Sequence, residues 1–238
     1  MTTTDGLFEA SIIQVGLYAA DLIKPGMRLG LGTGRTASAF LDALAKRPVA
    51  EMGLVAMCTS KRTEERARSL GIQILGSSQP PLDLDLDGAD EIDPELNLVK
   101  GAGGAMVREK IVAERSRRFL VLADSTKLVE RLGDGHPIPL EVLAFDWEGT
   151  AARVRDACLG EPRLRGQDQP FVTDNGNYVL DLSLPPGTWE PHRLVSELDR
   201  IPGVLGHGLF LSTATAALVS DGRSVRVLGD LEAERAIP

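Results

Sequence analysis

The sequence is poor in the residue types that build metal sites and disulfide frameworks. Its 238 residues include two cysteines and three histidines. Cys58 and Cys158 lie far apart and form no C-x-x-C pair, so we expect neither a zinc site nor a disulfide framework. The three histidines, at positions 136, 192 and 207, lack metal-ligand spacing, and we expect them to be surface or packing residues. The sequence therefore predicts no metal and favours the reducing cytoplasm as the protein's location.

Basic residues are outnumbered, and long apolar stretches are missing. The chain has 26 lysines and arginines against 34 aspartates and glutamates, which gives a formal charge of -8 and a pI near 5.0. This balance disfavours binding to nucleic acid. No stretch is apolar enough to cross a bilayer, and residues 1–22 lack the basic start of a secretory leader. The 43% hydrophobic residues and the mean hydropathy of -0.03 are typical of a globular protein that binds no membrane.

Helix and strand patterns alternate through the first half of the chain. Apolar residues recur there either at spacings of three and four or at every second position. The predicted helices are 8–22, 37–44, 63–70 and 106–113, and the predicted strands are 27–31, 54–58, 82–87, 96–99 and 119–123. We expect strand 82–87 to have one apolar face, because leucines alternate with aspartates. The alternation predicts an α/β fold with an open, doubly wound parallel sheet, whose ligands bind beyond the carboxyl ends of the strands.

A second, smaller domain is expected after the turn-rich segment 133–137. An Asn-Gly pair at 175–176 is suited to a tight hairpin, and the pattern at 191–201 predicts a helix. Three further strand patterns are expected to return to the first sheet, at 208–211, 215–219 and 224–228. The predicted domains are a catalytic domain of residues 1–138 plus 212–238 and an inserted small α+β domain of residues 139–211.

The segment Gly32-Thr33-Gly34-Arg35-Thr36 connects the first predicted strand to its helix. Glycines allow a close approach of the backbone, and free amides at a helix start attract anions, so phosphate is the expected ligand. A dinucleotide-binding loop would have glycine in place of Arg35 and an acid in place of Cys58, and a P-loop would end in Gly-Lys-Ser/Thr. A tight connection without a ligand is the alternative interpretation.

Acidic residues crowd the segment 87–93, at the end of a predicted strand. Like charges this close repel one another unless a ligand or a reaction uses them. A hard cation is one such use, although the spacing matches no calcium loop, and acid–base chemistry on a sugar is the other. Lys100 and Glu109 follow, and each alone would be expected in a solvated ion pair of about 0–1 kcal/mol. Their convergence with Lys127 at one sheet edge favours a functional site.

Four blocks occur together in one order, and through them the chain resembles the type A family of ribose-5-phosphate isomerases. The blocks are Gly32-Thr33-Gly34-Arg35-Thr36-Ala37, Asp87-Gly88-Ala89-Asp90-Glu91, Lys100-Gly101-Ala102-Gly103-Gly104-Ala105 with Arg108-Glu109-Lys110, and Ala123-Asp124-Ser125-Thr126-Lys127. Matches at 172–177 and 201–204 extend the similarity across nearly the whole chain.

The resemblance implies interconversion of D-ribose 5-phosphate and D-ribulose 5-phosphate in the non-oxidative pentose phosphate pathway, without metal or organic cofactor. It also implies a Rossmann-like main domain with a small ferredoxin-like domain, assembled as homodimers or homotetramers. By the same resemblance Glu109 is the general base, Asp87 and Lys100 serve ring opening and hydroxyl proton handling, and Asp90 is a further active-site acid. The implied contacts to the phosphate are Thr33, Gly34, Thr36 and Lys127, to which we add Gly32, Arg35, Gly101 and Gly103 as candidate substrate-binding residues.

The chemistry of an aldose–ketose isomerase agrees with these assignments. Moving a proton between C2 and C1 requires a base aimed at a carbon-bound hydrogen and a cation that stabilises the enediolate oxygens. The chain departs from the family pattern where Arg35 replaces a common serine and where Ile12 or Ile13 replaces a lysine. We hypothesise that Arg35 supplies the missing cation, because a guanidinium can contact phosphate through two nitrogens.

Two other functions are weighed against this one. An amino-sugar phosphate isomerase-deaminase shares the glycine-threonine loop, but the block from Lys100 to Glu109 argues against it. A regulator that senses a sugar phosphate without turnover would need a helix-turn-helix module ahead of the sheet. About one helix is predicted before the first strand, so the sequence favours the isomerase.

Overall fold

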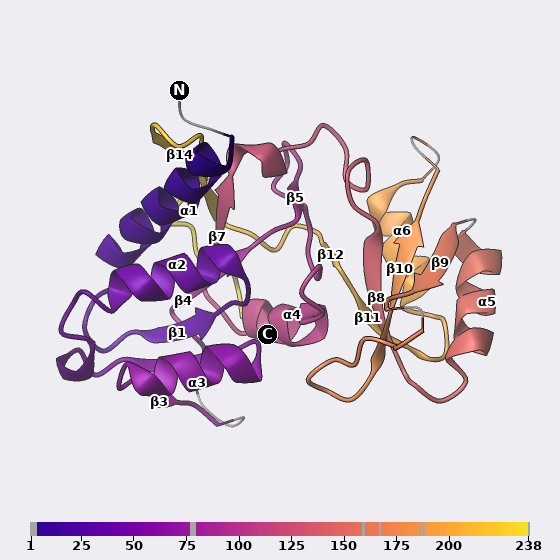
Figure 1. The fold of residues 1–238 in the computed structure, drawn as a ribbon, viewed down its shortest axis with the longest axis horizontal. Helices are drawn as coiled ribbons and strands as arrows, with labels where there is room; N and C mark the ends of the chain where they lie inside the picture. The colour runs from indigo at the N-terminus through magenta and orange to yellow at the C-terminus, as the bar shows by residue number, and fades with distance from the viewer. Residues whose placement is uncertain are drawn as a thin grey trace. The chain divides into compact units, whose positions relative to one another are not determined.

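Figure 1 shows the computed structural model of the chain, which describes residues 4–76, 80–158, 160–166, 168–185, 187 and 189–237. The chain divides into two compact units. The first is made of Met1–Ala89, Arg108–Lys127 and Ser212–Pro238, and the second of Asp90–Val107 and Leu128–Leu211. Each unit has its own cluster of buried apolar side chains. The domain boundaries expected from the sequence, residues 1–138 plus 212–238 and residues 139–211, stay a prediction.

The first unit is built on a seven-stranded sheet with the order β14-β13-β7-β4-β1-β2-β3. Its strands are β1 (Arg28–Leu31), β2 (Val55–Cys58), β3 (Gln73–Ile74), β4 (Leu84–Gly88), β7 (Phe119–Asp124), β13 (Ala216–Ser220) and β14 (Val225–Gly229). Neighbours pair in parallel except β13 and β14. The predicted α/β fold with a mostly parallel sheet is confirmed. The strand order reverses between β1 and β4, and open sheets of this kind bind ligands at such a switch point.

Helices cover this sheet. They are α1 (Thr4–Asp21), α2 (Arg35–Leu44), α3 (Lys61–Ser69) and α4 (Met106–Glu114), with short 3-10 turns at Val49–Glu51 (η1) and Ser125–Lys127 (η2). α1 packs against α2, β7 and β13, and α3 packs against β2 and β3. The crossing of α1 and α2 is close, because a Cβ added at Gly16 would lie 2.8 Å from the backbone of Ala39. In the described part of the chain, no helix combines the length and the apolar character needed to cross a bilayer.

Both faces of strand β4 are buried, including the face that carries its aspartates. Leu84 and Leu86 are 4% and 0% exposed, and Asp85 and Asp87 are 0% and 1% exposed. The strand lies between β1 and β7 in the interior of the sheet. The leucines form the one apolar face that was expected, and the acidic face is buried as well, since a central strand of a doubly wound sheet is covered on both faces.

The second unit holds two antiparallel sheets, with the orders β11-β8-β10-β9 and β12-β6-β5. Its elements are β5 (Glu91–Ile92), β6 (Leu98–Val99), β8 (Ile138–Val142), α5 (Trp147–Cys158), β9 (Glu161–Leu164), β10 (Tyr178–Ser183), α6 (Pro191–Leu198), β11 (Val204–His207) and β12 (Leu209–Phe210). Of the last three predicted strands, β13 and β14 return to the first sheet. The segment 208–211 does not, because β12 pairs with β6.

Candidate active site

At the switch point of the first unit, the backbone after β1 approaches the end of β4 so closely that only glycine fits between them. A Cβ added at Gly32, one residue after β1, would collide with the carboxylate of Asp87 at the end of β4. The backbone N–H of Gly32 donates to the carbonyl of Leu86 (2.9 Å), and that of Thr33 donates to Asp87 Oδ1 (3.1 Å). Asp87 Oδ1 also accepts from the N–H of Gly88 (2.7 Å). The predicted phosphate loop and the predicted acid thus contact each other directly.

The glycine loop leads into α2 with its first amides uncapped by a side chain. Gly34 is the N-cap residue, with a φ of 116° and no side-chain cap. That φ lies in the region that favours glycine. The carbonyl of Gly34 accepts from the N–H (3.0 Å) and the hydroxyl (2.8 Å) of Ser38. Uncapped amides and the positive end of the helix dipole together form a site for an anion.

A network of hydroxyl groups holds Thr33 in place. Thr33 Oγ1 lies 2.7 Å from Thr59 Oγ1, and Thr63 Oγ1 donates to the carbonyl of Gly32 (2.9 Å). Ser60 caps α3 by accepting from the N–H of Thr63 (3.2 Å). The only sequence signal was the Thr-Ser pair at the end of β2, which is also typical of an ordinary helix cap. The network fixes the loop between β1 and α2 to the loop that follows β2.

Glu109 lies in the first turn of α4 and is 5% exposed. The N–H of Leu82, just before β4, donates to the carbonyl of Arg115, just after α4 (2.9 Å), so α4 runs antiparallel to the strands. Val112 of this helix packs on β1, because a Cβ added at Gly30 would lie 2.6 Å from its Cγ1. Residues three apart share a helix face.

This geometry brings Glu109 toward the same edge as the glycine loop. Three helical residues rise about 4.5 Å, which places Glu109 nearer the carboxyl edge of the sheet than Val112. Two strand residues rise about 6.6 Å, which is the step from Gly30 to Gly32. Measured along the strand direction, the buried carboxylate of Glu109 therefore lies at about the same height as the glycine loop and Asp87.

Lys127 stands at the same edge, after β7. The segment Ser125–Lys127 forms a 3-10 turn directly after Asp124, the last residue of the strand. The Asp124 carboxylate accepts from the N–H of Thr126 (2.9 Å) and so shapes the turn. β4 and β7 are neighbours in parallel register, with Gly88 opposite Leu122. Lys127 is half-buried, and it places a cation at the carboxyl edge of the first unit.

The other predicted catalytic residues belong to the second unit. Asp90 and Lys100 flank the antiparallel pair of β5 and β6 at one end, since the N–H of Asp90 donates to the carbonyl of Val99 (2.8 Å). Asp90 Oδ2 accepts from the N–H of Ala102 (2.9 Å). Lys100 is 3% exposed, and its ammonium lies 5.6 Å from the centre of the Phe210 ring. The unit thus brings a carboxylate and a buried ammonium to one end of a hairpin.

The glycine-rich loop after Lys100 is fixed by its neighbours. Gly101 has a φ of 102°, and its carbonyl accepts from Arg165 Nη1 (3.0 Å), which also donates to the carbonyl of Ala102 (2.8 Å). A Cβ added at Gly103 would meet no atom within 4 Å. Gly101 therefore shapes the loop, while Gly103 leaves open space beside it. Arg165, which the sequence analysis did not single out, is the residue that clamps this loop.

The burial of Cys58, the last residue of β2, raises its pKa from 9.0 to about 12, and the carboxylate of Glu64 adds to the rise. The thiol therefore stays protonated near neutral pH and is a poor nucleophile or metal ligand. Within the described ranges, no group of three or more His, Cys, Asp or Glu side chains could hold a metal ion.

Comparison with known proteins identifies the family. The sequence model described as "Ribose 5-phosphate isomerase A (phosphoriboisomerase A)" matches residues 55–223. A probable ribose-5-phosphate isomerase 3, chloroplastic, from Arabidopsis thaliana is 43% identical over 221 residues, which cover 88% of this chain and 79% of the relative. The chain belongs to the ribose 5-phosphate isomerase A family. It is an aldose–ketose isomerase that acts on a sugar phosphate.

Solved structures of ribose 5-phosphate isomerases have the same fold. The enzyme from Methanocaldococcus jannaschii has a TM-score of 0.85 and 32% identity, over 96% of this chain and 100% of the other. A D-ribose-5-phosphate isomerase in complex with phospho-erythronic acid has a TM-score of 0.84 and 30% identity, again over 96% and 100%.

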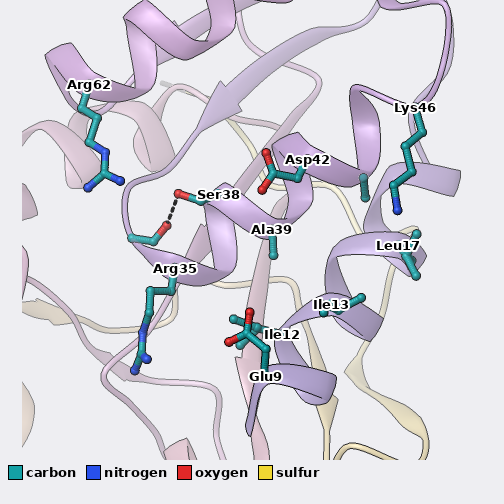
Figure 2. Close-up of a pocket in the computed structure, with 12 residues that line it drawn as sticks. Glu9, Ile12, Ile13, Leu17, Arg35, Ser38, Ala39, Asp42, Lys46 and Arg62 are labelled. Carbon is teal, nitrogen blue, oxygen red and sulfur yellow. Dashed lines mark hydrogen bonds between the residues drawn. The ribbon is translucent and has the colours of Figure 1, made fainter. Parts of the chain in front are cut away.

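Arg35, for which the sequence predicts a contact with phosphate, is the first residue of α2 and lines a cavity of about 530 Å³. Figure 2 shows its side chain reaching from the start of α2 toward the part of α1 that carries Glu9. The cavity is also lined by Gly34 and by Arg62 from the start of α3. Arg62 was not predicted as a site residue, because on its own it looks like one more charge on a solvated helix.

Proposed function

We propose that this protein interconverts D-ribose 5-phosphate and D-ribulose 5-phosphate with Glu109, Asp87 and Lys100 acting on one substrate. The observation that carries the proposal is the contact of the Asp87 carboxylate with the amide of Thr33 (3.1 Å). It ties an acid–base group to a loop suited to phosphate, at the switch point of the sheet. The related enzyme in complex with phospho-erythronic acid supports a phosphorylated sugar chain as the ligand.

The phosphate of the substrate binds at the start of α2 in this proposal. The amides of the glycine loop and of the first helical turn donate to its oxygens. Lys127 and Arg35 neutralise its charge. With the phosphate held, the other end of the sugar extends toward the carboxylates, and the reacting carbons are held close to the base. Gly32 keeps this end of the site narrow, since any side chain there would displace Asp87.

The reaction proceeds by proton transfer. Asp87, assisted by Asp90, moves a hydroxyl proton so that the furanose opens to the aldehyde. Glu109 takes the proton from C2, which leaves a cis-enediolate on C1 and C2, and then returns a proton to C1. The hydroxyl proton moves from O2 to O1, and Lys100 stabilises the negative charge on these oxygens. Atoms balance without any added oxidant or reductant.

The proposed catalytic residues follow one another closely in the chain. Asp87 and Asp90 are three positions apart in the sequence, a distance that the chain spans with about 10 Å at most. Glu109 follows the unit boundary at Val107 and Arg108 by one residue. The predicted small domain of residues 139–211 begins after all of these residues, so its insertion does not interrupt this part of the chain. Gly101 and Gly103 complete the proposed sugar-binding loop beside Lys100.

A coupled assay of the purified protein with ribose 5-phosphate tests the function. We expect formation of ribulose 5-phosphate, undiminished after dialysis against EDTA, since the proposed chemistry uses no metal. Release of ammonia from an amino-sugar phosphate would indicate the isomerase-deaminase alternative. Binding of ribose 5-phosphate without product would indicate the sensor alternative.

We also propose a cytoplasmic location and a homodimer or homotetramer. Both rest on the family resemblance and on the expectations from composition. Light scattering coupled to size-exclusion chromatography measures the assembly. A mass of two or four times 25.5 kDa is expected, and a monomer that retains full activity would contradict the proposed assembly.

A further inference from the structure

Phe8 of α1 lies under the guanidinium of Arg35, the first residue of α2. The guanidinium carbon is 4.2 Å from the centre of the Phe8 ring. Phe8 is half-buried and Arg35 is exposed. A cation stacked on an aromatic face at this distance is attracted by the ring quadrupole. The contact therefore restrains a long side chain that would otherwise move freely in solvent.

Stacking uses the face of the guanidinium and leaves its edge available. The five N–H donors of arginine lie in the plane of the group, so a ring against one face blocks none of them. Among the described residues, no carboxylate forms an ion pair with Arg35. Glu9 and Asp42 line the same cavity, but Asp42 is paired with Arg66 at 2.8 Å. The donors of Arg35 therefore remain available to an anionic ligand.

We propose that Phe8 is a positioning residue, which holds Arg35 ready to bind the phosphate of the substrate. The inference rests on the proposed function, because it needs the phosphate to bind at the start of α2. An unrestrained arginine loses rotamer freedom when it binds a ligand. The ring restrains the arginine before binding, so the arginine loses less freedom when phosphate arrives. Phe8 itself touches no substrate.

Two substitutions separate the ring from the apolar volume. Phe8→Leu removes the π face, and Phe8→Tyr keeps it. We expect Phe8→Leu to raise KM for ribose 5-phosphate, and the inhibition constant of inorganic phosphate, by about two- to fivefold. We expect kcat of Phe8→Leu to change little. In Phe8→Tyr, which keeps the ring, KM and the inhibition constant should both stay at their wild-type values. Phe145, which is 82% exposed in the second unit, provides the control Phe145→Leu with unchanged constants.

A double-mutant cycle tests whether Phe8 acts through Arg35. In an Arg35→Ser background, Phe8→Leu should have no further effect on KM or on inhibition by phosphate. An undiminished effect in that background would show that Phe8 acts through general packing and would overturn the inference. So would an active Phe8→Leu enzyme with wild-type constants. These outcomes require an active wild type, whereas failure of the proposed function is a wild type that forms no ribulose 5-phosphate.

Discussion

Glu109 offers a change of one functional group with almost no change of shape. Glu109→Gln keeps the volume but removes the group that accepts a proton. We expect kcat to fall by about 10²- to 10⁴-fold, the usual contribution of a general base, with KM changed much less. Steady-state kinetics with ribose 5-phosphate measures both constants.

Glu114→Gln is the matched control for this substitution. Glu114 ends the same helix, is half-exposed and pairs with Arg235 at 3.2 Å. A surface pair of this kind contributes about 0–1 kcal/mol, so activity should stay at the wild-type level. Equal losses in the two variants would remove Glu109 from the role of base.

Gly32 tests the close approach of the loop to Asp87. Gly32→Ala places a methyl group where the Asp87 carboxylate lies, so the loop or the carboxylate has to move. We expect kcat/KM to fall by about tenfold or more and the free energy of unfolding to fall by about 1–3 kcal/mol. Kinetics and urea denaturation measure the two effects.

Gly76→Ala provides the comparison. A Cβ there meets no atom within 4 Å, so neither activity nor stability should decrease. If Gly32→Ala behaved like Gly76→Ala, the contact between the loop and Asp87 would have no part in catalysis.

Cys58 provides a prediction about pH. Its pKa is raised from 9.0 to about 12, so the thiolate is about a thousandfold rarer at pH 8 in the folded chain than in the unfolded chain. In a Cys158→Ser background, iodoacetamide should label the native protein far more slowly than the urea-unfolded protein. Comparable labelling rates would contradict the burial of this thiol.

The same pKa affects stability at high pH. Between pH 9 and about 12 the unfolded chain loses the thiol proton while the folded chain keeps it, so the free energy of unfolding decreases as pH rises through this range. Cys58→Ala should make that decrease smaller. The comparison uses denaturation curves at pH 8 and pH 10.

Much of the site could be predicted residue by residue from the sequence, and some of it could not. The glycine loop and the acids after β4 stand out because their residue types are unusual at strand ends. Phe8 and Thr63 do not, because an aromatic on an amphipathic helix and a threonine near a cap have ordinary structural roles. Their part depends on contacts between elements that lie far apart in sequence, and no local pattern reports such contacts.

At the level of elements, the start of α2 is where the charge of Arg35 matters. Arg35→Ser removes a cation from the proposed phosphate site, and a hydrogen bond to a charged group contributes about 1.5–3 kcal/mol. We expect KM for ribose 5-phosphate to rise by about tenfold or more while kcat changes less. Arg66→Ser removes an exposed arginine of α3 that pairs with Asp42 at 2.8 Å, and its kinetics should match the wild type. An unchanged KM in Arg35→Ser would assign the phosphate to the backbone amides alone.

Elements with strong periodicity were predicted well, and short or mixed ones were not. α1, α2 and β7 lie within a few residues of their predicted ranges. β9 was missed, because its sequence Glu-Pro-Arg-Leu has the polar residues and the proline of a loop. It is a strand because β10 pairs with it along four residues. β12 was assigned to the wrong sheet, since local pattern carries no information about which strand becomes the partner.

At the level of the whole molecule, the chain crosses four times between two units that each have a core. The predicted base and phosphate loop belong to the first unit, and Lys100 with Asp90 belongs to the second. Sequence order alone did not predict this division, because Lys100 and Glu109 are only nine residues apart. Proton transfer by the carboxylate of Glu109 is the central claim of the proposed function.

Isomerisation in D₂O, followed by proton NMR of the C2 hydrogen of ribose 5-phosphate, tests that claim most directly. If a carboxylate carries the proton, solvent deuterium replaces this hydrogen over repeated turnovers with the wild type, and the replacement is slowed with Glu109→Gln in proportion to its kcat. The account would be contradicted if, over many turnovers, no deuterium entered C2 of ribose 5-phosphate or C1 of ribulose 5-phosphate, or if the replacement ran at the wild-type rate in Glu109→Gln.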